Sequence, residues 1–413
     1  MATMHETSAG ELLFSCARAR IDPKELDRVR ELASAENLDW NLTIKLAADH
    51  GVVPLLHHSL QRAGAESIPK EFRDRLQRQV QANALNNLLM MRELIKLTGA
   101  MESQQVRVLP YKGPTLAMIA YGDLSLRQCG DLDILVPQRD IEKSKEVLVA
   151  HGYQPMFDTD EKTEANRVAL PHEYDYVYSR KDPPVMVELH WQVMGKLFSF
   201  DPDPDDLWNR AAPQNVAGAT MRMLSPEDLL LILSAHGMKH FWTRLGWICD
   251  LAEFIRSCPK IDWQKLLQRS TELNARGILM LGLVLANRVV GAAVPANVLA
   301  LARRSVHQQA AELEKQLFIP HKNDELPLGA RSKLASGGML QSLIFHVRTR
   351  ESLADGMRYC FHRALTPTVN DITWIRLPRG LNFLYYLLRP LRLTAQGITS
   401  ARNRITRKIS AAR

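Results

Sequence analysis

Cysteine is scarce in this chain, and its pattern excludes two common ways of stabilising a fold. There are five cysteines in 413 residues, an odd number, and no two of them form a C-x-x-C pair. A disulfide framework and a structural zinc site both need paired or closely spaced thiols, so neither is expected. Free thiols are typical of a reducing compartment, and we expect the protein in the cytoplasm. The five are Cys16, Cys129, Cys249, Cys258 and Cys360.

Long hydrophobic runs are also missing. The longest runs from Ile278 to Ala286, contains a glycine in its middle, and is ended by Asn287 and Arg288. A membrane-spanning helix needs about 20 apolar residues, so this run is too short to cross a bilayer. The N-terminal residues lack the basic stretch followed by an apolar run that marks a secretion signal. We therefore expect a soluble protein that contacts a membrane at most peripherally.

The composition is otherwise that of a globular protein with a basic bias. Hydrophobic residues make up 46% and charged residues 24% of the sequence, and its length suits two or three domains. The net charge of +8 favours anionic partners such as nucleotides, nucleic acid or acidic lipid. No basic stripe interleaved with aromatic residues is present, so nucleic-acid binding is not supported. Basic residues gather near the C-terminus, where no acidic residue follows Asp371.

Three carboxylates on two predicted strands form the most informative pattern. Asp131 and Asp133 are two residues apart in an alternating segment, so in a strand both side chains project from one face. Glu188 lies in a second alternating strand, with His190 on the same face. Like charges repel, so such acids persist together mainly around a cation, and Mg²⁺ prefers oxygen ligands that it shares with phosphates. As the alternative to a metal site, Asp131 and Asp133 lie on a strand face that water solvates. His190 either orients a metal ligand or is a histidine of the core.

A Lys112-Gly113-Pro114 turn precedes the first acidic strand. The Lys112 ammonium can neutralise phosphate charge, while amides around Gly113 and the following helix N-terminus can bind phosphate oxygens. Otherwise Gly113 serves backbone geometry alone and Lys112 lies in solvent. Arg127, four residues before Asp131, either clamps a phosphate or pairs with one of the two aspartates.

Several short motifs follow one another along the chain in a specific order and spacing. They are Lys112-Gly113, Tyr121-Gly122-Asp123, Arg127, Asp131-x-Asp133-x-Leu135-Val136, Gly152-Tyr153, Glu188-Leu189-His190-Trp191, His236-Gly237-x-Lys239-His240 and Trp247-x-x-Asp250. This series resembles the nucleotidyltransferase superfamily that includes DNA polymerase beta. It is more similar to a bacterial branch usually labelled uncharacterised nucleotidyltransferases, and the resemblance runs from about Trp40 to Leu393. Most of the superfamily has Gly-Ser or Gly-Gly at the turn, so here Thr115 or Lys112 would replace the serine that touches a phosphate.

The resemblance implies an α+β fold, with a nucleotidyltransferase-like mixed, largely antiparallel sheet flanked by N-terminal and C-terminal helical regions. It implies that Asp131, Asp133 and Glu188 hold one or two Mg²⁺ or Mn²⁺ ions, with Glu188 alternatively acting as general base. An NMP would move from an NTP, with ATP as the expected donor, to a hydroxyl acceptor that the sequence does not identify. Pyrophosphate would leave beside Lys112 and Gly113.

Two other classes of protein fit the same residues. One is a catalytically inactive relative that binds a nucleotide or a partner. The other is a peripheral membrane or assembly protein that uses its basic C-terminal segment. The apolar residues and arginines of that segment either dock on the body of the protein or lie on an anionic membrane surface.

A later helical segment carries polar residues at three- and four-residue spacing. His236, His240 and Asp250 share one face with Trp247 if that helix is unbroken. Together with Lys239, they line the cleft opposite the acidic strands and face the acceptor or the nucleotide. Alternatively, they lie between packed helices, where their polar groups form hydrogen bonds with one another. The glutamate of an H-E-x-x-H motif is absent, so a zinc hydrolase is not expected.

Four regions are predicted from composition and periodicity. Residues 1–104 form a helical N-terminal region, and residues 105–200 form the α+β catalytic core, in which the strands around Tyr176 and Glu188 make a hairpin. Residues 201–320 form a helical domain that completes the cleft. It opens with an acidic linker at 201–206 and has helices at 226–257 (with a break near 241), 262–273 and 275–290. Residues 321–413 form a loop followed by a basic, partly amphipathic C-terminal region.

Overall fold

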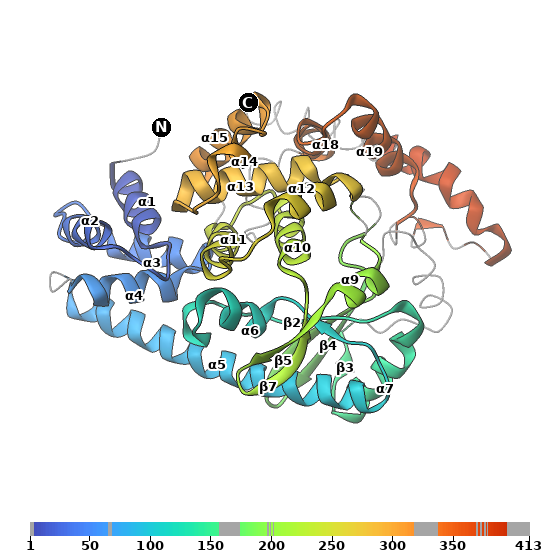
Figure 1. The fold of residues 1–413 in the computed structure, drawn as a ribbon, viewed down its shortest axis with the longest axis horizontal. Helices are drawn as coiled ribbons and strands as arrows, with labels where there is room; N and C mark the ends of the chain where they lie inside the picture. The colour runs from blue at the N-terminus through green and yellow to red at the C-terminus, as the bar shows by residue number, and fades with distance from the viewer. Residues whose placement is uncertain are drawn as a thin grey trace, which may run out of the picture.

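Helices predominate in the computed structural model and surround one mixed sheet (Figure 1). The structure describes residues 4–64, 68–156, 174–195, 198, 200, 202–317, 338–368, 371, 374–375, 377 and 379–394. No helix within these ranges is both long and apolar enough to cross a membrane. The predicted α+β class, with helical regions before and after the sheet, is confirmed.

The N-terminal region is helical, as predicted. Its elements are α1 (Met4–Cys16), α2 (Pro23–Ala33), α3 (Trp40–Asp49), α4 (Val53–Ala63) and α5 (Lys70–Ser103). Asp22 caps α2 by accepting a hydrogen bond from the N–H of Glu25, which satisfies one of the free donors at the helix start. The long helix α5 runs along the sheet (Figure 1), and its buried side chains from Met90 to Met101 pack against the apolar face of the sheet.

The sheet has the order β1-β2-β5-β4-β3. The strands are β1 (Leu109–Pro110), β2 (Leu132–Leu135), β3 (Gln154–Pro155), β4 (Asp175–Lys181) and β5 (Pro184–His190). β2 and β5 are parallel, and the other neighbouring pairs are antiparallel, including the predicted β4–β5 hairpin. The register places Asp133 opposite Glu188. The alternating residues Ile134 and Leu189 point into the core beside α5, which leaves the polar side chains on the other face.

Short helical elements connect the first strands. The turn after β1 leads into α6 (Gly113–Leu116), a π-helical turn (Ala117–Tyr121) and a 3₁₀ turn (Leu124–Leu126) before β2 begins. Between β2 and β3 lie a 3₁₀ turn (Gln138–Asp140) and α7 (Ile141–Ala150). The connection from β1 to β2 is thus helical but irregular, whereas α7 is a regular helix.

The predicted acidic linker at 201–206 is wrong. Helix α9 (Pro204–Arg210) begins inside it, with Asp203 accepting from the N–H of Asp205 and Leu207 fully buried. Acidic residues suit the first turn of a helix because they face the positive end of its dipole, so acidity alone did not indicate a linker. A hairpin of β6 (Ala212–Val216) and β7 (Ala219–Met223) follows and was not predicted; its buried side chains pack against Met91 of α5.

The following region is helical with a break where one was predicted. Its elements are α10 (Pro226–Lys239), α11 (Leu245–Ser257), α12 (Trp263–Glu272), α13 (Arg276–Val290), α14 (Ala296–Leu299) and α15 (Arg304–Gln316). Phe241 and Trp242 adopt positive φ angles of 56° and 51°, which turn the chain between α10 and α11. Trp242 folds back onto Gly237, where a Cβ would lie 2.5 Å from the indole ring. Only glycine leaves room for this ring.

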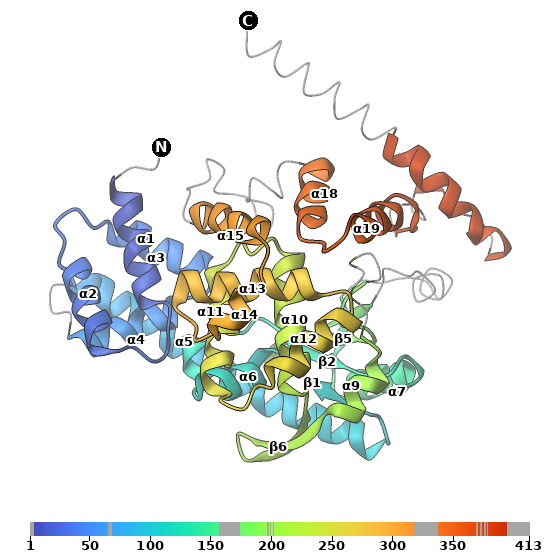
Figure 2. The ribbon, with the colours of Figure 1, turned by 45° about the horizontal axis from the view of Figure 1, so that its top comes forward.

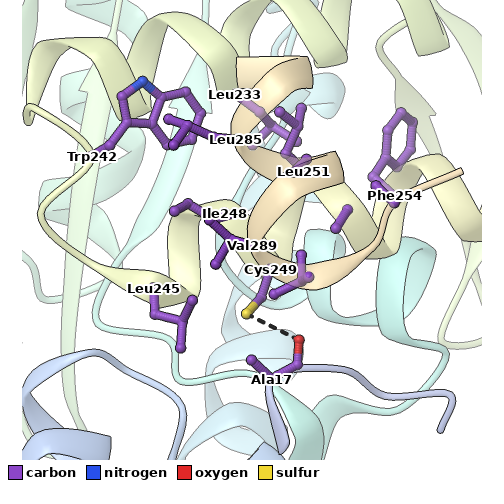
Figure 3. Close-up of a cluster of buried hydrophobic side chains, with 14 of the residues drawn as sticks. Ala17, Leu233, Trp242, Leu245, Ile248, Cys249, Leu251, Phe254, Leu285 and Val289 are labelled. Carbon is purple, nitrogen blue, oxygen red and sulfur yellow. Dashed lines mark hydrogen bonds between the residues drawn. The ribbon is translucent and has the colours of Figure 1, made fainter. Parts of the chain in front are cut away.

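One buried cluster joins helices that are far apart in the sequence. Leu233 of α10, Leu251 of α11 and Leu285 of α13 pack beside the Trp242 ring (Figure 3). The Cys249 thiol donates a hydrogen bond of 3.4 Å to the carbonyl of Ala17, just after α1. The N-terminal helices α1–α4 and helices α10–α15 therefore share one hydrophobic core.

The C-terminal region contains α18 (Gly338–Arg348), α19 (Leu353–Leu365), a 3₁₀ segment (Arg379–Leu384) and a helix over 385–394. These elements lie beyond α12 and α13, on the side away from the sheet (Figures 1 and 2). Asp371 is buried and accepts hydrogen bonds from Arg389 at 2.9 Å and Arg392 at 2.5 Å. The loop predicted at the start of residues 321–413 lies outside the described residues up to position 337, as does the chain beyond 394.

Candidate active site

The polar residues singled out in the sequence gather around one cavity of about 330 Å³. One wall comes from the turn after β1 and from strands β2 and β5, and the opposite wall comes from α10 and α11. Nine of the predicted residues line it: Lys112, Arg127, Asp131, Asp133, Glu188, His190, His236, Lys239 and His240. Gly113, Thr115 and Asp250 are buried behind the walls.

Asp133, Glu188 and His190 form a tight acidic cluster. Asp133 and Glu188 are direct neighbours across the parallel strands β2 and β5, and the Nε2 atom of His190 lies 3.3 Å from a carboxylate oxygen of each. One potential ligand atom from each side chain lies within 4.8 Å of the others, close enough to surround a single metal ion. Lys112 reaches in from the turn, with its Nζ 2.6 Å from Oδ1 of Asp133.

The charges in this group are unbalanced. Burial would raise the pKa of Asp133, but Lys112 and His190 outweigh burial and hold that pKa well below its usual range. The contact with His190 lowers the pKa of Glu188. Burial would lower the pKa of His190, but the carboxylates of Asp133 and Glu188 outweigh burial and raise it. Asp131 shows the opposite shift, because burial and then the charge of Asp133 raise its pKa to about 6. Negative charge beside Asp131 is thus only partly compensated, and a cation would relieve it.

The Lys-Gly turn approaches the acidic strand very closely. Gly113 has a φ of +54°, and a Cβ at this position would lie 2.8 Å from the backbone carbonyl oxygen of Asp131. Glycine is therefore required both by the left-handed conformation and by the space. The Thr115 hydroxyl donates a 2.7 Å hydrogen bond to the carbonyl of Lys112 and so holds the turn rather than lining the cavity.

Arg127 and Asp250 join the turn to the helical wall. The Nε and Nη2 atoms of Arg127 lie 2.8 and 3.0 Å from the two carboxylate oxygens of Asp250 on α11, and the Tyr121 hydroxyl donates to the same carboxylate at 2.7 Å. Nη1 of Arg127 also donates to the carbonyl of Gly113 at 3.3 Å. The sequence alone predicts that Arg127 clamps a phosphate or pairs with Asp131 or Asp133. Its partner is instead an acid 123 residues away.

Aromatic rings and cations make up the opposite wall. The rings of His236, His240 and Trp247 are in mutual contact, with centroids 4.8 to 5.4 Å apart. Burial lowers the pKa of His236 well below its usual value, and burial together with the charge of Lys239 lowers that of His240 to about 3. Both imidazoles are therefore neutral near pH 7. Lys239 and Arg244 supply the positive charge of this wall.

Tyr174 and Arg244 are among the cavity residues that were not predicted as part of the site. The Tyr174 ring stacks on His190 with centroids 5.9 Å apart, and its hydroxyl accepts a hydrogen bond from Lys239. Arg244 precedes α11 and lines the cavity beside Trp247. Tyr174 directly precedes β4, in which Asp175 pairs with His190. Its alternation with Tyr176 and Tyr178 was the available sequence signal. No sequence signal distinguishes Arg244 from other surface arginines.

Comparison with known proteins identifies the family. The family described as "Uncharacterised nucleotidyltransferase" matches residues 36–291, which is more than half of the chain, and the chain belongs to this family. A solution structure of the antibiotic-resistance factor ANT(2'')-Ia is similar at 12% sequence identity and a TM-score of 0.32. That match covers 47% of this chain and 94% of the other. The search of curated proteins found no match.

Proposed function

We propose that this protein transfers a nucleotidyl group from an NTP, with ATP as the expected donor, to a hydroxyl acceptor. The observation that carries the proposal is the pairing of Asp133 with Glu188 on parallel neighbouring strands, with Asp131 and Lys112 beside them in one cavity. Membership of a nucleotidyltransferase family supports the same reaction class. The acceptor is left open, because the cavity walls offer both charged and aromatic surfaces.

The donor atoms fit a divalent cation. Oδ1 of Asp133 and both ring nitrogens of His190 are buried and lack a hydrogen bond of regular geometry within the described residues. The Lys112 ammonium lies against Oδ1, so positive charge already occupies part of the cluster. Asp131, Asp133 and Glu188 would hold Mg²⁺ or Mn²⁺, with His190 as a further ligand. The bound ion would lower the pKa of the acceptor hydroxyl and neutralise charge on the phosphates.

The chain's own residues account for the remaining requirements. As the alternative to holding the ion, Glu188 acts as the general base, because its lowered pKa keeps it ionised at neutral pH and able to accept the proton of the acceptor hydroxyl. The acceptor oxygen then attacks the α-phosphorus, the bond from that phosphorus to the bridging oxygen breaks, and pyrophosphate leaves. Lys112 lies where it can neutralise the departing charge, and Lys239 and Arg244 face it from the other wall. Arg127 and Asp250 keep the Lys-Gly turn fixed against α11.

Calorimetric titration of each NTP, with and without Mg²⁺ or Mn²⁺, tests this proposal. We expect one NTP to bind in a metal-dependent manner and to lose binding in Asp131→Asn/Asp133→Asn. Asp27→Asn is the matched control, because this exposed carboxylate lies on α2 outside the cavity. Binding of the NTP should then allow a screen for acceptors that release pyrophosphate.

The opposite result is equally clear. If no NTP binds to wild-type protein whose circular dichroism shows an intact fold, the enzyme proposal is wrong. The inactive, partner-binding relative then becomes the better interpretation of this family member. Metal-independent NTP binding that survives the double substitution would also contradict the roles given to Asp131 and Asp133.

A further inference from the structure

Exposed apolar side chains concentrate in the C-terminal region. Eleven of the sixteen large hydrophobic residues that are exposed within the described ranges lie between residues 344 and 391. Six of them form two stripes at four-residue intervals with exposed fractions of 61 to 87%: Leu353, Met357 and Phe361 on α19, and Phe383, Leu387 and Leu391 on the last segment. A stripe at this spacing follows one side of a helix, and such a side normally packs against something.

The exposure does not come from a lack of folded structure. Tyr385 and Arg389 of the last segment are buried, and Tyr385 donates a 2.9 Å hydrogen bond to the carbonyl of Ile375. Arg389 and Arg392 both bind the buried Asp371. The terminal segment thus has an inner side with specific partners, while Leu387 and its neighbours point outward.

The same region holds all of the chain's excess positive charge. Residues 338–413 contain 13 of the 53 basic residues but only 3 of the 45 acidic ones, a formal charge of +10. The remaining 337 residues have a formal charge of −2. All three acids are engaged with cations: Glu351 with Arg276, Asp355 with Arg358, and Asp371 with Arg389 and Arg392.

We infer that α19 and the 379–394 segment form a membrane-binding face that rests on an anionic lipid surface. Apolar side chains on the outer side of helices, combined with a strong local positive charge, are the two features that bring a protein to such a surface. A second copy of the chain fits less well, because residues 338–413 carry a formal charge of +10 in each copy and would repel each other. The face lies away from the sheet (Figure 2), and none of its residues lines the cavity, so the inference is independent of the proposed reaction.

Co-sedimentation of the full chain with vesicles tests the inference. We expect binding to phosphatidylcholine vesicles that contain phosphatidylglycerol, little binding to phosphatidylcholine alone, and weaker binding at high salt. Phe361→Ser/Leu387→Ser should weaken binding about tenfold or more, since it removes two exposed apolar side chains. Leu85→Ser/Leu88→Ser is the matched control, because these residues of α5 are similarly exposed but lie outside the face.

Each other outcome decides against the inference. Absence of binding to the anionic vesicles overturns it, as does equal binding to neutral vesicles or equal loss in the control variant. Light scattering of the protein alone tests whether a second copy of the chain, rather than a membrane, covers this face. A dimer that dissociates in Phe361→Ser/Leu387→Ser, but not in the control, would assign the face to a second copy instead.

Discussion

Lys112 and Asp133 form a buried ion pair at the centre of the candidate active site, with Nζ 2.6 Å from Oδ1. The two side chains are 11% and 1% exposed, so water screens their attraction only weakly. The lysine comes from the turn after β1 and the aspartate from β2, and the close approach of Gly113 to the backbone of Asp131 sets their separation. Under the proposed function, the ammonium shares a ligand with the metal ion and must move as the ion and the nucleotide enter.

Because Lys112 and the metal ion compete for Asp133, Lys112→Met should raise the affinity for the ion and lower the rate of nucleotidyl transfer. Without the ammonium, Mn²⁺ should bind to the nucleotide-free protein about tenfold more tightly, because one competing charge is gone. Nucleotidyl transfer should nevertheless fall by about 10²–10³, the usual effect of losing one group that stabilises developing charge. Calorimetry and a pyrophosphate-release assay measure the two effects, with the exposed Lys181→Met as control. Unchanged Mn²⁺ affinity would show that lysine and ion do not compete for Asp133.

The position of His190 predicts a nitrogen ligand on the bound ion. Its Nε2 lies 3.3 Å from carboxylate oxygens of both Asp133 and Glu188, so an ion held by these two carboxylates would have this nitrogen within reach. Pulsed electron paramagnetic resonance of the Mn²⁺ complex should therefore show coupling to ¹⁴N. The coupling should vanish in His190→Gln and persist in His240→Gln, whose ring lies across the same cavity. Coupling that survives in His190→Gln would remove His190 from the metal site.

Much of the candidate site was predictable because its residues lie on regular strands. The two-residue spacing of Asp131 and Asp133 places both on one face, and the same periodicity aligns Glu188 with His190. Which strands are neighbours is a matter of topology. The resemblance to a known fold supplied that information, while alternation alone did not.

The partner of Arg127 could not be predicted in the same way. Asp250 is 123 residues further along the chain, and the contact depends on the turn at Phe241 and Trp242 that swings α11 toward the sheet. The β6–β7 hairpin was missed for a different reason. Its first strand, Ala212–Val216, is mostly exposed and polar, so it lacks the apolar alternation that marks a strand.

The Arg127–Asp250 pair predicts a graded loss of stability. Asp250→Asn keeps the shape but leaves the buried guanidinium without a counter-charge, which should cost about 3–5 kcal/mol. Tyr121→Phe removes a single hydrogen bond to the same carboxylate and should cost about 1 kcal/mol. Urea denaturation measures both free energies of unfolding. Equal losses in the two variants would show that the ion pair adds nothing beyond one neutral hydrogen bond.

Two glycines predict opposite responses to alanine. A Cβ at Gly237 would lie 2.5 Å from the buried Trp242 ring, so Gly237→Ala must displace the indole and should destabilise by about 1–3 kcal/mol or more. Gly99 lies within α5 with nothing inside 4 Å of its Cβ position. Gly99→Ala should therefore stabilise by about 0.5–1 kcal/mol through lower backbone entropy in the unfolded chain. Thermal unfolding of both variants gives the sign of each change.

The ion pair between Glu93 and Arg180 fastens α5 to β4 and predicts how stability varies with pH. The pair is 2.9 Å apart with each side chain 11% exposed, and the Tyr153 hydroxyl donates to the same carboxylate at 3.3 Å. Burial would raise the pKa of Glu93, but Arg180 and its neighbours outweigh burial and lower it. A lowered folded pKa stabilises the protein above the unfolded value of about 4.3, and this contribution disappears as the pH falls through the folded pKa.

Glu93→Gln should therefore be more destabilising at pH 7, by about 1.5–3 kcal/mol, than at pH values below the folded pKa. In Arg180→Gln the shift should reverse, because burial then acts on Glu93 alone and raises its pKa. That variant should lose less stability on acidification than the wild type does. Denaturation of the three proteins from pH 7 to acid isolates the contribution of Glu93, since the other carboxylates are common to all. Parallel curves would mean that the pKa of Glu93 is the same in the folded and unfolded states, and that the pair fastens α5 by packing alone.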